Sequence, residues 1–303
     1  MKTEPDHGLA PEEMVAILEA TGDFRVLRRL QPLQGLAEAP PGAKRGVVLD
    51  VETTGLDPEV DEIIELAMLP FFYSDDDEIV AIGIPFNELR EPTRPIPAEV
   101  TKLTGIDHDM VAGKSIDPDA VGQFARGSLV VAHNAAFDRR FVEKFCPSFG
   151  RSPWACSMSE VPWKDDGFES NKLAFLASTS GFYYDRHRAI HDCHATVEIL
   201  TRPLASTGSS AFKTLLASAR TNKIRCWAEN SPFDKKDILK TRGYRWSGDQ
   251  SGQPRGWWID VGEADLPAEV SFLHSDIYQR DVPIRTSAIT AFNRYSDRLL
   301  ITA

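Results

Sequence analysis

Three short runs of strand-forming residues between positions 47 and 86 constrain the fold of this chain more than any other feature. They are VVLDVE, IIELAMLPFFY and IVAIGIPF, and polar turns separate them. Runs arranged in this way predict three adjacent strands. A fourth run, SLVVAHN, lies between two segments with helical apolar spacing, and a strand between helices favours a mixed α/β sheet. The helical patterns cover residues 98–103, 117–126, 135–145, 172–180 and 189–200.

Changes of composition on both sides of this region indicate separate modules. Residues 11–30 have helical apolar spacing, interrupted at Gly22, and a stretch rich in Pro and Gly follows at 31–46. Pro203 and the sequence TGSS mark a second boundary. The modules that we expect are a helical segment and linker at 1–45, a central domain at 46–206 and a small α+β accessory domain at 211–303.

The distribution of charge supports this division. Residues 211–303 contain 14 Lys and Arg against 11 Asp and Glu, which leaves 20 against 34 for residues 1–210. Because the formal net charge of the whole chain is −11, its surface as a whole is unsuited to wrapping a polyanion. Any contact with nucleic acid therefore has to be local or assisted by metal ions.

The sequence also predicts the compartment. No apolar run approaches the roughly 18–20 residues that span a bilayer, and the acidic opening MKTEPDHGLAPEE lacks the profile of a secretion signal. We therefore expect a cytoplasmic protein without membrane contact. The four cysteines form no C-x-x-C pair, which is typical of reduced structural thiols and not of a disulfide framework or zinc knuckle. They are Cys146, Cys156, Cys193 and Cys226.

The segment VVLDVETTGLDP, residues 47–58, carries the strongest chemical signal. Side chains two apart in a strand share a face, so Asp50 and Glu52 point the same way. Gly55 and Pro58 place both acids near the end of the strand. Two adjacent carboxylates repel each other unless a cation lies between them, and a divalent ion with oxygen ligands meets that need. An isolated D-x-E can equally be a pair of exposed acids on an edge strand.

Two later segments supply further polar groups. In VVAHNAAFDRRFV a strand runs into a helix that carries Asp138 beside an apolar anchor of Phe137 and Phe141. In HRAIHDCHAT, His187 stands five residues before Asp192. Taken singly, an Asp on a helix is usually solvated and a lone His is usually structural, so the signal lies in the combination.

Other polar residues stay outside the expected site. A zinc site built from His187, His191, His194 and Cys193 would lack a complete tetrahedral set. We expect His191 and His194 on exposed turns of a helix. We assign Glu62 and Glu65 to polar positions of a strand and leave Glu65 out of the site.

In this chain order, the motifs D-x-E-T-T-G-x-x-P, H-N-A-x-F-D and H-R-A-x-x-D resemble those of the DEDDh family of 3′-5′ exonucleases. That family includes the proofreading epsilon subunit of bacterial DNA polymerase. The resemblance covers about residues 46–204 and implies a ribonuclease H-like mixed sheet flanked by helices. The sister subgroup, with Y-x(3)-D, would require Tyr at the position of Arg188. A ribonuclease H-type endonuclease would not require a His five residues before its last acid.

The resemblance also implies a catalytic apparatus. The metal ligands would be Asp50, Glu52, Asp138 and Asp192, and the general base would be His187. An all-oxygen set suits two divalent cations, Mg²⁺ or Mn²⁺, with Asp50 as the bridging ligand. A neutral imidazole near pH 7 can accept a proton from the attacking water.

Substrate-binding residues follow from the same resemblance. The loop after the D-x-E strand would lie against the terminal nucleotide, with Leu56 wedged near the last base; its residues are Thr53, Thr54, Gly55 and Leu56. The alternative is a tight strand-to-loop turn without such a role. His133 and Asn134 would contact the scissile strand, although Asn134 can instead cap its helix.

The C-terminal region contains a second pattern, outside this resemblance. The segment DKKDILKTRGYRWSGDQSGQPRGWWIDV predicts a helix followed by a β-hairpin with a Gly-rich turn. Because strand residues alternate, at most some of Trp246, Trp257 and Trp258 are free to stack on bases, and core filling is their more common role. The segment is cationic, as a domain that guides a nucleic-acid strand requires. Its cations are Lys235, Lys236, Lys240, Arg242, Arg245 and Arg255.

These features together predict a metal-dependent 3′-5′ exonuclease that releases nucleoside 5′-monophosphates from nucleic acid with a free 3′ end. DNA is favoured over RNA because the motifs look most like those of proofreading relatives. The alternatives are a 3′-5′ exoribonuclease and a non-catalytic adaptor that binds nucleic acid or a polymerase. The expected partners include a polymerase or repair assembly.

Overall fold

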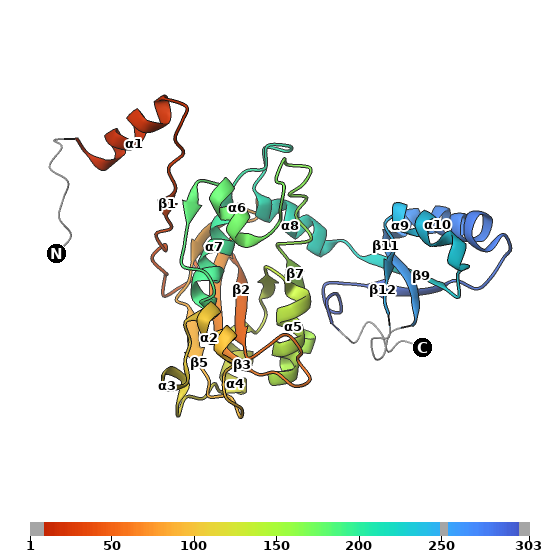
Figure 1. Cartoon of the computed structure of the whole chain (residues 1–303), viewed down its shortest axis with the longest axis horizontal. Coiled ribbons are helices and arrows are strands. Elements are labelled where there is room, and N and C mark those ends of the chain that lie inside the picture. The colour runs from red at the N-terminus through yellow and green to blue at the C-terminus, as the bar shows by residue number, and fades with distance from the viewer. Residues whose placement is uncertain (1–8, 249–253, 297–303) are drawn as a thin grey trace.

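The largest part of the fold is a six-stranded mixed sheet (Figure 1). The structure is a computed structural model, and it describes residues 9–248 and 254–296. The strands of this sheet are β2 (Lys44–Thr53), β3 (Ile63–Tyr73), β4 (Ile79–Ile82), β5 (Phe86–Leu89), β6 (Leu129–Ala132) and β7 (Trp154–Cys156). They lie in the order β4-β3-β2-β6-β7, and β5 also pairs with β3. Because β3 is antiparallel to its neighbours whereas β6 and β7 run parallel to β2, the predicted mixed sheet is confirmed.

The third predicted strand is two strands in the structure. β4 pairs with Phe71–Tyr73 and β5 pairs with Glu65–Met68, so the ladder is interrupted near Pro70. The Pro70 carbonyl accepts a hydrogen bond from Gly83 N at 2.8 Å, but proline has no N–H to donate in return. The break therefore follows from one residue in the middle of β3.

Helices cover both faces of this sheet, because alternate residues of its strands are apolar (Figure 1). On one face, Val48 and Leu69 pack with α6 (Leu173–Thr179), α7 (Ala189–Thr201) and α8 (Ala211–Arg220). On the other face, Val47 and Met68 pack with α4 (Pro118–Ala125) and α5 (Ala135–Phe145). The remaining helices here are α2 (Ala98–Thr104), α3 (His108–Val111) and the 3-10 turn Pro147–Arg151. The five predicted helical segments are thus present.

The N-terminal segment differs from the prediction. Helix α1 (Pro11–Ala20) ends before Gly22, whose φ of +80° lies in the left-handed region. Beyond it, Arg28–Arg29 forms the short strand β1, which pairs in parallel with β8 (Phe182–Tyr183). The predicted helical continuation to residue 30 was therefore wrong, and the chain instead runs extended toward the larger sheet.

A second sheet follows in the C-terminal region. Its four antiparallel strands are β9 (Lys223–Glu229), β10 (Arg245–Trp246), β11 (Gly256–Gly262) and β12 (Arg285–Ile289), in the order β10-β11-β9-β12. The helices here are α9 (Lys236–Thr241) and α10 (Leu266–Phe272), with short helical turns at Phe233–Lys235, Glu263–Asp265 and Leu273–Tyr278. The predicted helix and hairpin are present, although part of the Gly-rich turn, residues 249–253, lies outside the described residues.

Helix α8 belongs to the larger sheet, so the smaller body starts later than residue 211. Phe212 makes edge-on contacts with Phe71 and Tyr73, with ring centroids 5.1 and 5.2 Å apart. The other apolar residues of α8 also join the core of the larger sheet. The chain enters the second sheet only after Arg220, because the apolar face of α8 is needed to cover β3.

Two further predictions can be compared with the structure. All four cysteines are buried free thiols, as predicted. Within residues 9–248 and 254–296, no helix is long and apolar enough to cross a membrane.

Candidate active site

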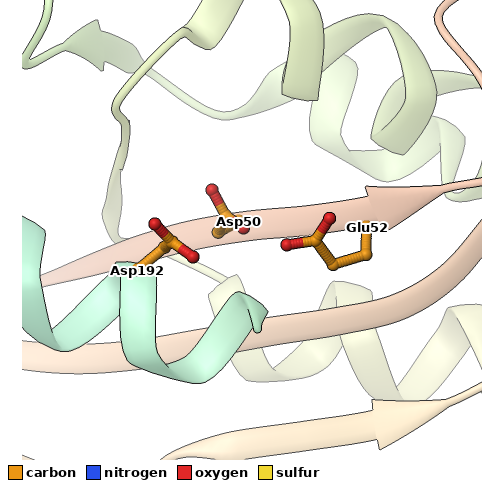
Figure 2. Close-up of side chains that lie close together, drawn as sticks. All are labelled: Asp50, Glu52 and Asp192. Atoms are coloured by element: carbon orange, nitrogen blue, oxygen red, sulfur yellow. The ribbon is translucent and has the colours of Figure 1, made fainter. Parts of the chain in front are cut away.

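Three carboxylates from two distant segments converge at the end of β2. Asp50 and Glu52 share one face of β2, and Asp192 comes from the first turn of α7, which packs on that face (Figure 2). One oxygen of each carboxylate lies within 4.8 Å of the others. The strand period places the first two side by side, and the packing of α7 on the sheet brings in the third.

Asp138 lies alongside this cluster. It is 3% exposed on the first turn of α5, and its Oδ1 accepts a hydrogen bond from Val51 N at 3.3 Å. That amide belongs to the residue between Asp50 and Glu52. The Phe137 and Phe141 rings, 4.9 Å apart, form the predicted apolar anchor beside Asp138.

The electrostatics of the cluster favour a bound cation. Burial raises the pKa of Asp50 well above its ordinary value, and the charges of Asp138 and Asp192 raise it further. Burial and the charge of Asp192 raise the pKa of Glu52 to about 8, and burial raises that of Asp138 to about 7. Carboxylates in such a group are stable in ionised form only beside positive charge. Their all-oxygen donor set therefore fits a hard divalent cation.

The loop before α7 fixes Asp192 and places His187. Asp192 Oδ1 accepts a hydrogen bond from the Tyr184 hydroxyl at 2.8 Å, and Oδ2 accepts one from His187 N at 2.9 Å. His187 has a φ of +63°, a left-handed conformation that is uncommon for a residue with a side chain. The turn thus holds the His187 backbone against Asp192, and the His187 side chain is half-buried.

Glu65 is a site residue that sequence analysis missed. It lies directly opposite Glu52 in the β2–β3 ladder and is completely buried, not a solvated polar position. Its carboxylate accepts hydrogen bonds from Arg188 Nη2 at 2.9 Å and from Ala189 N at 3.0 Å. The available signal was an acid within an otherwise apolar strand. Tyr184 was missed as well, and it has no comparable signal in sequence.

The loop after β2 presents Leu56 to solvent. The Thr53 hydroxyl donates to Gly55 O at 2.5 Å, and the Thr54 hydroxyl donates to Asp61 Oδ1 at 3.2 Å. A Cβ atom at Gly55 would lie 2.4 Å from the Asp61 carboxylate, so a larger residue there would displace the Asp61 side chain from its hydrogen bonds. Both threonines are buried, whereas the Leu56 side chain is 82% exposed. The turn is internally bonded and leaves one apolar side chain available for contact.

The two residues at the start of α5 differ in accessibility. His133 uses both ring nitrogens within the protein, with Nδ1 2.8 Å from Ser157 Oγ and Nε2 2.9 Å from Asn171 O. Burial lowers its pKa to about 4. Asn134 occupies the N-cap position, but its side chain makes no capping hydrogen bond and is exposed. Of the two, Asn134 has the side chain that is free to contact a substrate.

The histidine-rich part of α7 does not form a metal site. His191 and His194 are half-buried, so the prediction of exposed positions was wrong. His191 Nδ1 lies 3.0 Å from the Asp185 carbonyl, and Cys193 is buried with Sγ directed at the carbonyls of Val48 and Ala67. Within the described residues, the carboxylates Asp50, Glu52 and Asp192 form the one cluster that could hold a metal ion.

Comparison with known proteins places this site in a family. The model of the exonuclease family RNase_T matches residues 47–200, about half of the chain. The chain belongs to this exonuclease family. The match includes the converging carboxylates and His187, and the resemblance to DEDDh exonucleases is confirmed. Residues 47–200 thus form an exonuclease domain, on the mixed sheet predicted for it.

Individual relatives match the same region. The PolC-type DNA polymerase III of Clostridium perfringens is 34% identical over 161 residues, which are 51% of this chain and 11% of the relative. The DNA polymerase III epsilon subunit of Treponema pallidum is 32% identical over 166 residues, 52% of this chain and 74% of the relative. The structure of exonuclease X in complex with 5′ overhanging duplex DNA has 27% identity and a TM-score of 0.43, covering 57% of this chain and 98% of that one. The chain spans about a ninth of the length of the PolC-type relative.

Proposed function

We propose that the protein is a metal-dependent 3′-5′ exonuclease that removes nucleoside 5′-monophosphates from the 3′ end of DNA. The observation that carries this proposal is the convergence of Asp50, Glu52 and Asp192, with Asp138 bonded to the backbone between the first two. DNA is the proposed polymer because the relatives are named as DNA polymerase III proteins.

The four acids would hold two divalent cations, Mg²⁺ or Mn²⁺, through carboxylate oxygens. Once bound, such cations supply charge neutralisation at the attacking and leaving oxygens of a phosphodiester and make water more acidic. Asp50 would be the central ligand of this set, because it lies between the carboxylates of Glu52 and Asp192 (Figure 2).

The other residues of the chain would move a proton and orient the substrate. His187 is the proposed general base, which accepts a proton from the attacking water. Leu56 would pack against the last base, and Asn134 would contact the strand. The hydrogen bonds from Tyr184 and from His187 N to Asp192 keep that ligand fixed while the proton moves.

A direct test uses 5′-labelled single-stranded DNA, duplex DNA with a frayed end, and RNA. Each is incubated with the full chain in Mg²⁺, in Mn²⁺ or in chelator. We expect a ladder of 3′-shortened products that requires metal and disappears in Asp50→Asn. Lack of any shortening by the native chain would contradict the proposal and favour a non-catalytic adaptor. Faster shortening of RNA than of DNA would favour the exoribonuclease alternative.

His187 requires its own test. We expect His187→Ala to lose most activity while it still binds Mn²⁺, and to lose the fall in rate on the acid side of the pH profile. An unchanged pH profile with normal metal binding would contradict the general-base role.

We also propose that the exonuclease works beside a DNA polymerase or repair assembly. The support is that the matched region of the PolC-type relative is part of a much longer polymerase. Co-elution of the purified chain with the replicative polymerase subunit of its own organism tests this proposal, and separate elution at micromolar concentration would contradict it.

A further inference from the structure

The C-terminal sheet has one face covered by its own helices and a second face without such helices, called the open face here. Ala228 on β9 and Ile259 on β11 point to the same side and pack with Leu239 of α9 and Leu273, next to α10. Trp257, opposite Ala228, joins this small core. Because successive strand residues alternate between faces, the neighbouring positions point away from these helices.

The open face carries cations and tryptophans. Lys223, Arg225 and Trp227 alternate along β9, and Trp258 pairs with Trp227 in the adjacent strand β11. Arg245 on β10 lies opposite Trp258 on its other side. The guanidinium carbons of Arg225 and Arg245 lie 3.7 and 5.4 Å from the centroid of the Trp258 ring. Trp227 and Arg225 are buried, so Trp258 is the tryptophan of this face that keeps partial exposure, with Arg225 against its ring and Arg245 beside it.

This face borders the exonuclease domain. A cavity of about 440 Å³ lies between them, lined on one side by Lys223, Arg245 and Trp258. On the other side it is lined by Asn134 and Ala136 at the start of α5. Asp138, which lies beside the carboxylate cluster, is on the first turn of the same helix. The cavity thus extends from the open face to the N-terminal end of the helix that carries Asp138.

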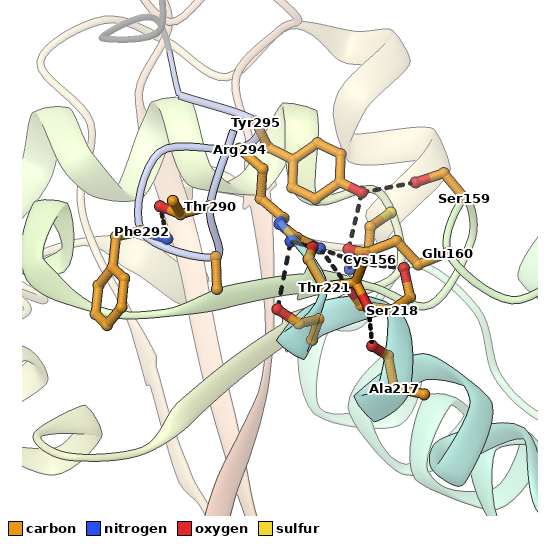
Figure 3. A network of polar contacts seen from close by, with 12 residues as sticks. Cys156, Ser159, Glu160, Ala217, Ser218, Thr221, Thr290, Phe292, Arg294 and Tyr295 are labelled. Atoms are coloured by element: carbon orange, nitrogen blue, oxygen red, sulfur yellow. Dashed lines mark hydrogen bonds and ion pairs between the residues drawn. The ribbon is translucent and has the colours of Figure 1, made fainter. Parts of the chain in front are cut away.

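The relative position of the two parts is fixed by buried polar contacts. Arg139 of α5 is completely buried and donates to the carbonyls of Phe292 and Arg294, each at 2.7 Å. Arg294 forms an ion pair with Glu160, and the Tyr295 hydroxyl donates to Glu160 Oε1 at 2.9 Å (Figure 3). The chain after β12 therefore returns to the exonuclease domain and holds the cavity walls together.

The acids that line the cavity are already paired. Glu160 is bonded to Arg294, and Asp260 accepts hydrogen bonds from Arg225 at 2.7 and 2.9 Å. Lys223 and Arg245 are exposed and form no ion pair within the described residues. These two cations are thus available to a ligand with negative charges.

We propose that this cavity binds the single-stranded part of the substrate on the 5′ side of the scissile nucleotide. Backbone phosphates would contact Lys223 and Arg245, and an unpaired base would stack near Trp258. A single strand is the favoured ligand because only unpaired bases can stack on an aromatic side chain. This inference rests on the proposed exonuclease function and names the form of its substrate.

The test compares two charge reversals on the same sheet. Lys223→Glu with Arg245→Glu changes the open face. Lys235→Glu with Lys240→Glu, called the α9 variant, makes the same charge change in α9 and the turn before it, on the covered side. Both are introduced into the full chain that also carries Asp50→Asn, so that the oligonucleotide stays intact. Fluorescence anisotropy with 5′-labelled oligothymidylates of 3 to 20 nucleotides measures the dissociation constants at several salt concentrations.

We expect the affinity of the parent to rise with length and then level off. The open-face variant should bind the 20-mer at least about tenfold more weakly, bind the 3-mer equally well, and show a salt slope smaller by about 1.4, as loss of two single-strand phosphate contacts requires. The α9 variant should bind like the parent. Equal binding of the 20-mer by open-face variant and parent, or an equal loss in the α9 variant, would overturn the inference.

A second measurement separates this inference from the proposed function. With Asp50 restored, the open-face variant should hydrolyse a dinucleotide at the native rate and a 20-mer with a raised KM. If the native chain hydrolyses neither, the proposed function fails even when the binding result stands. If the variant hydrolyses both at native rates and KM, the inference fails and the exonuclease function remains.

Discussion

Arg188 and Glu65 form an ion pair across the edge of the active site, with Nη2 2.9 Å from Oε1. Arg188 follows His187 directly, and Glu65 lies opposite Glu52 in the sheet. The pair therefore ties the loop that carries the proposed general base to the strand next to the metal ligands. Its members are 123 residues apart, so no local pattern in the sequence reveals it.

Arg188→Met should lower both stability and turnover. Glu65 would remain buried with its charge unpaired; since Arg188 is 32% exposed, we expect a loss of about 2 kcal/mol in the free energy of unfolding. We expect kcat to fall about 10- to 100-fold, as for other residues that orient metal-site groups. Urea denaturation and single-turnover kinetics measure the two effects. Arg202→Met, which breaks the surface pair with Glu198, is the matched control and should cost at most about 0.5 kcal/mol.

Metal binding should release protons near neutral pH. Since burial and neighbouring charge raise the pKa of Glu52 to about 8 and burial raises that of Asp138 to about 7, the metal-free cluster holds at least about one proton at pH 7. Mn²⁺ should displace it, and the affinity should rise as pH increases to 9. Calorimetric titration in two buffers of different ionisation enthalpy counts these protons. A count of zero at pH 7 would contradict the prediction, and Glu52→Gln should release fewer protons than the native chain.

Leu56→Ala should weaken substrate binding without affecting the fold. The side chain is 82% exposed, so its removal should change the free energy of unfolding by less than about 0.5 kcal/mol. Loss of its apolar contact with the last base should raise KM about fivefold, equivalent to about 1 kcal/mol. Steady-state kinetics on a single-stranded oligonucleotide measure this change. Val60→Ala removes another exposed apolar side chain from the same loop, and an equal effect there would contradict a specific role for Leu56.

His133 should make the fold sensitive to acid. Burial lowers its pKa from 6.5 to about 4, so between these values the unfolded chain binds a proton that the folded chain excludes. Its contribution to the free energy of unfolding is therefore intact above pH 6.5 and falls by about 3 kcal/mol as pH drops to about 4. Urea denaturation at several pH values measures this effect. Between pH 6.5 and about 4, the free energy of unfolding should fall more steeply for the native chain than for His133→Gln. His108→Gln removes an exposed imidazole and is the control; parallel curves for the native chain and His133→Gln would contradict the prediction.

The sequence predicted the sheet and the approach of its acids because both depend on local rules. A D-x-E strand places Asp50 and Glu52 on one face whatever the rest of the chain does, and the family motifs imply that Asp192 joins them. Glu65 and Tyr184 could not be assigned in this way, because their roles depend on which segment packs against them. The burial of Glu65 results from the packing of α7, and a strand pattern does not contain that information.

The module boundary was misplaced for a similar reason. The Pro203 and TGSS signals identify a turn, and they do not show to which sheet the next helix returns. Phe212 packs against Phe71 from a distant part of the chain. The hairpin of β10 and β11 was predictable because its strands are close in sequence. Which cations lie on which face of the sheet could be assigned only from the pairing register of the strands in the structure.

The anchoring of residues 291–296 to α5 also bears on how the enzyme would move along its substrate. The C-terminal sheet is joined to the exonuclease domain at both of its ends, by the connection from α8 and by the segment that Arg139 holds. A strand bound on the open face would stay associated with the protein after each nucleotide is removed. Its shortened 3′ end would then advance by one nucleotide into the active site. Rigid double attachment would in this way favour many successive cuts in a single encounter.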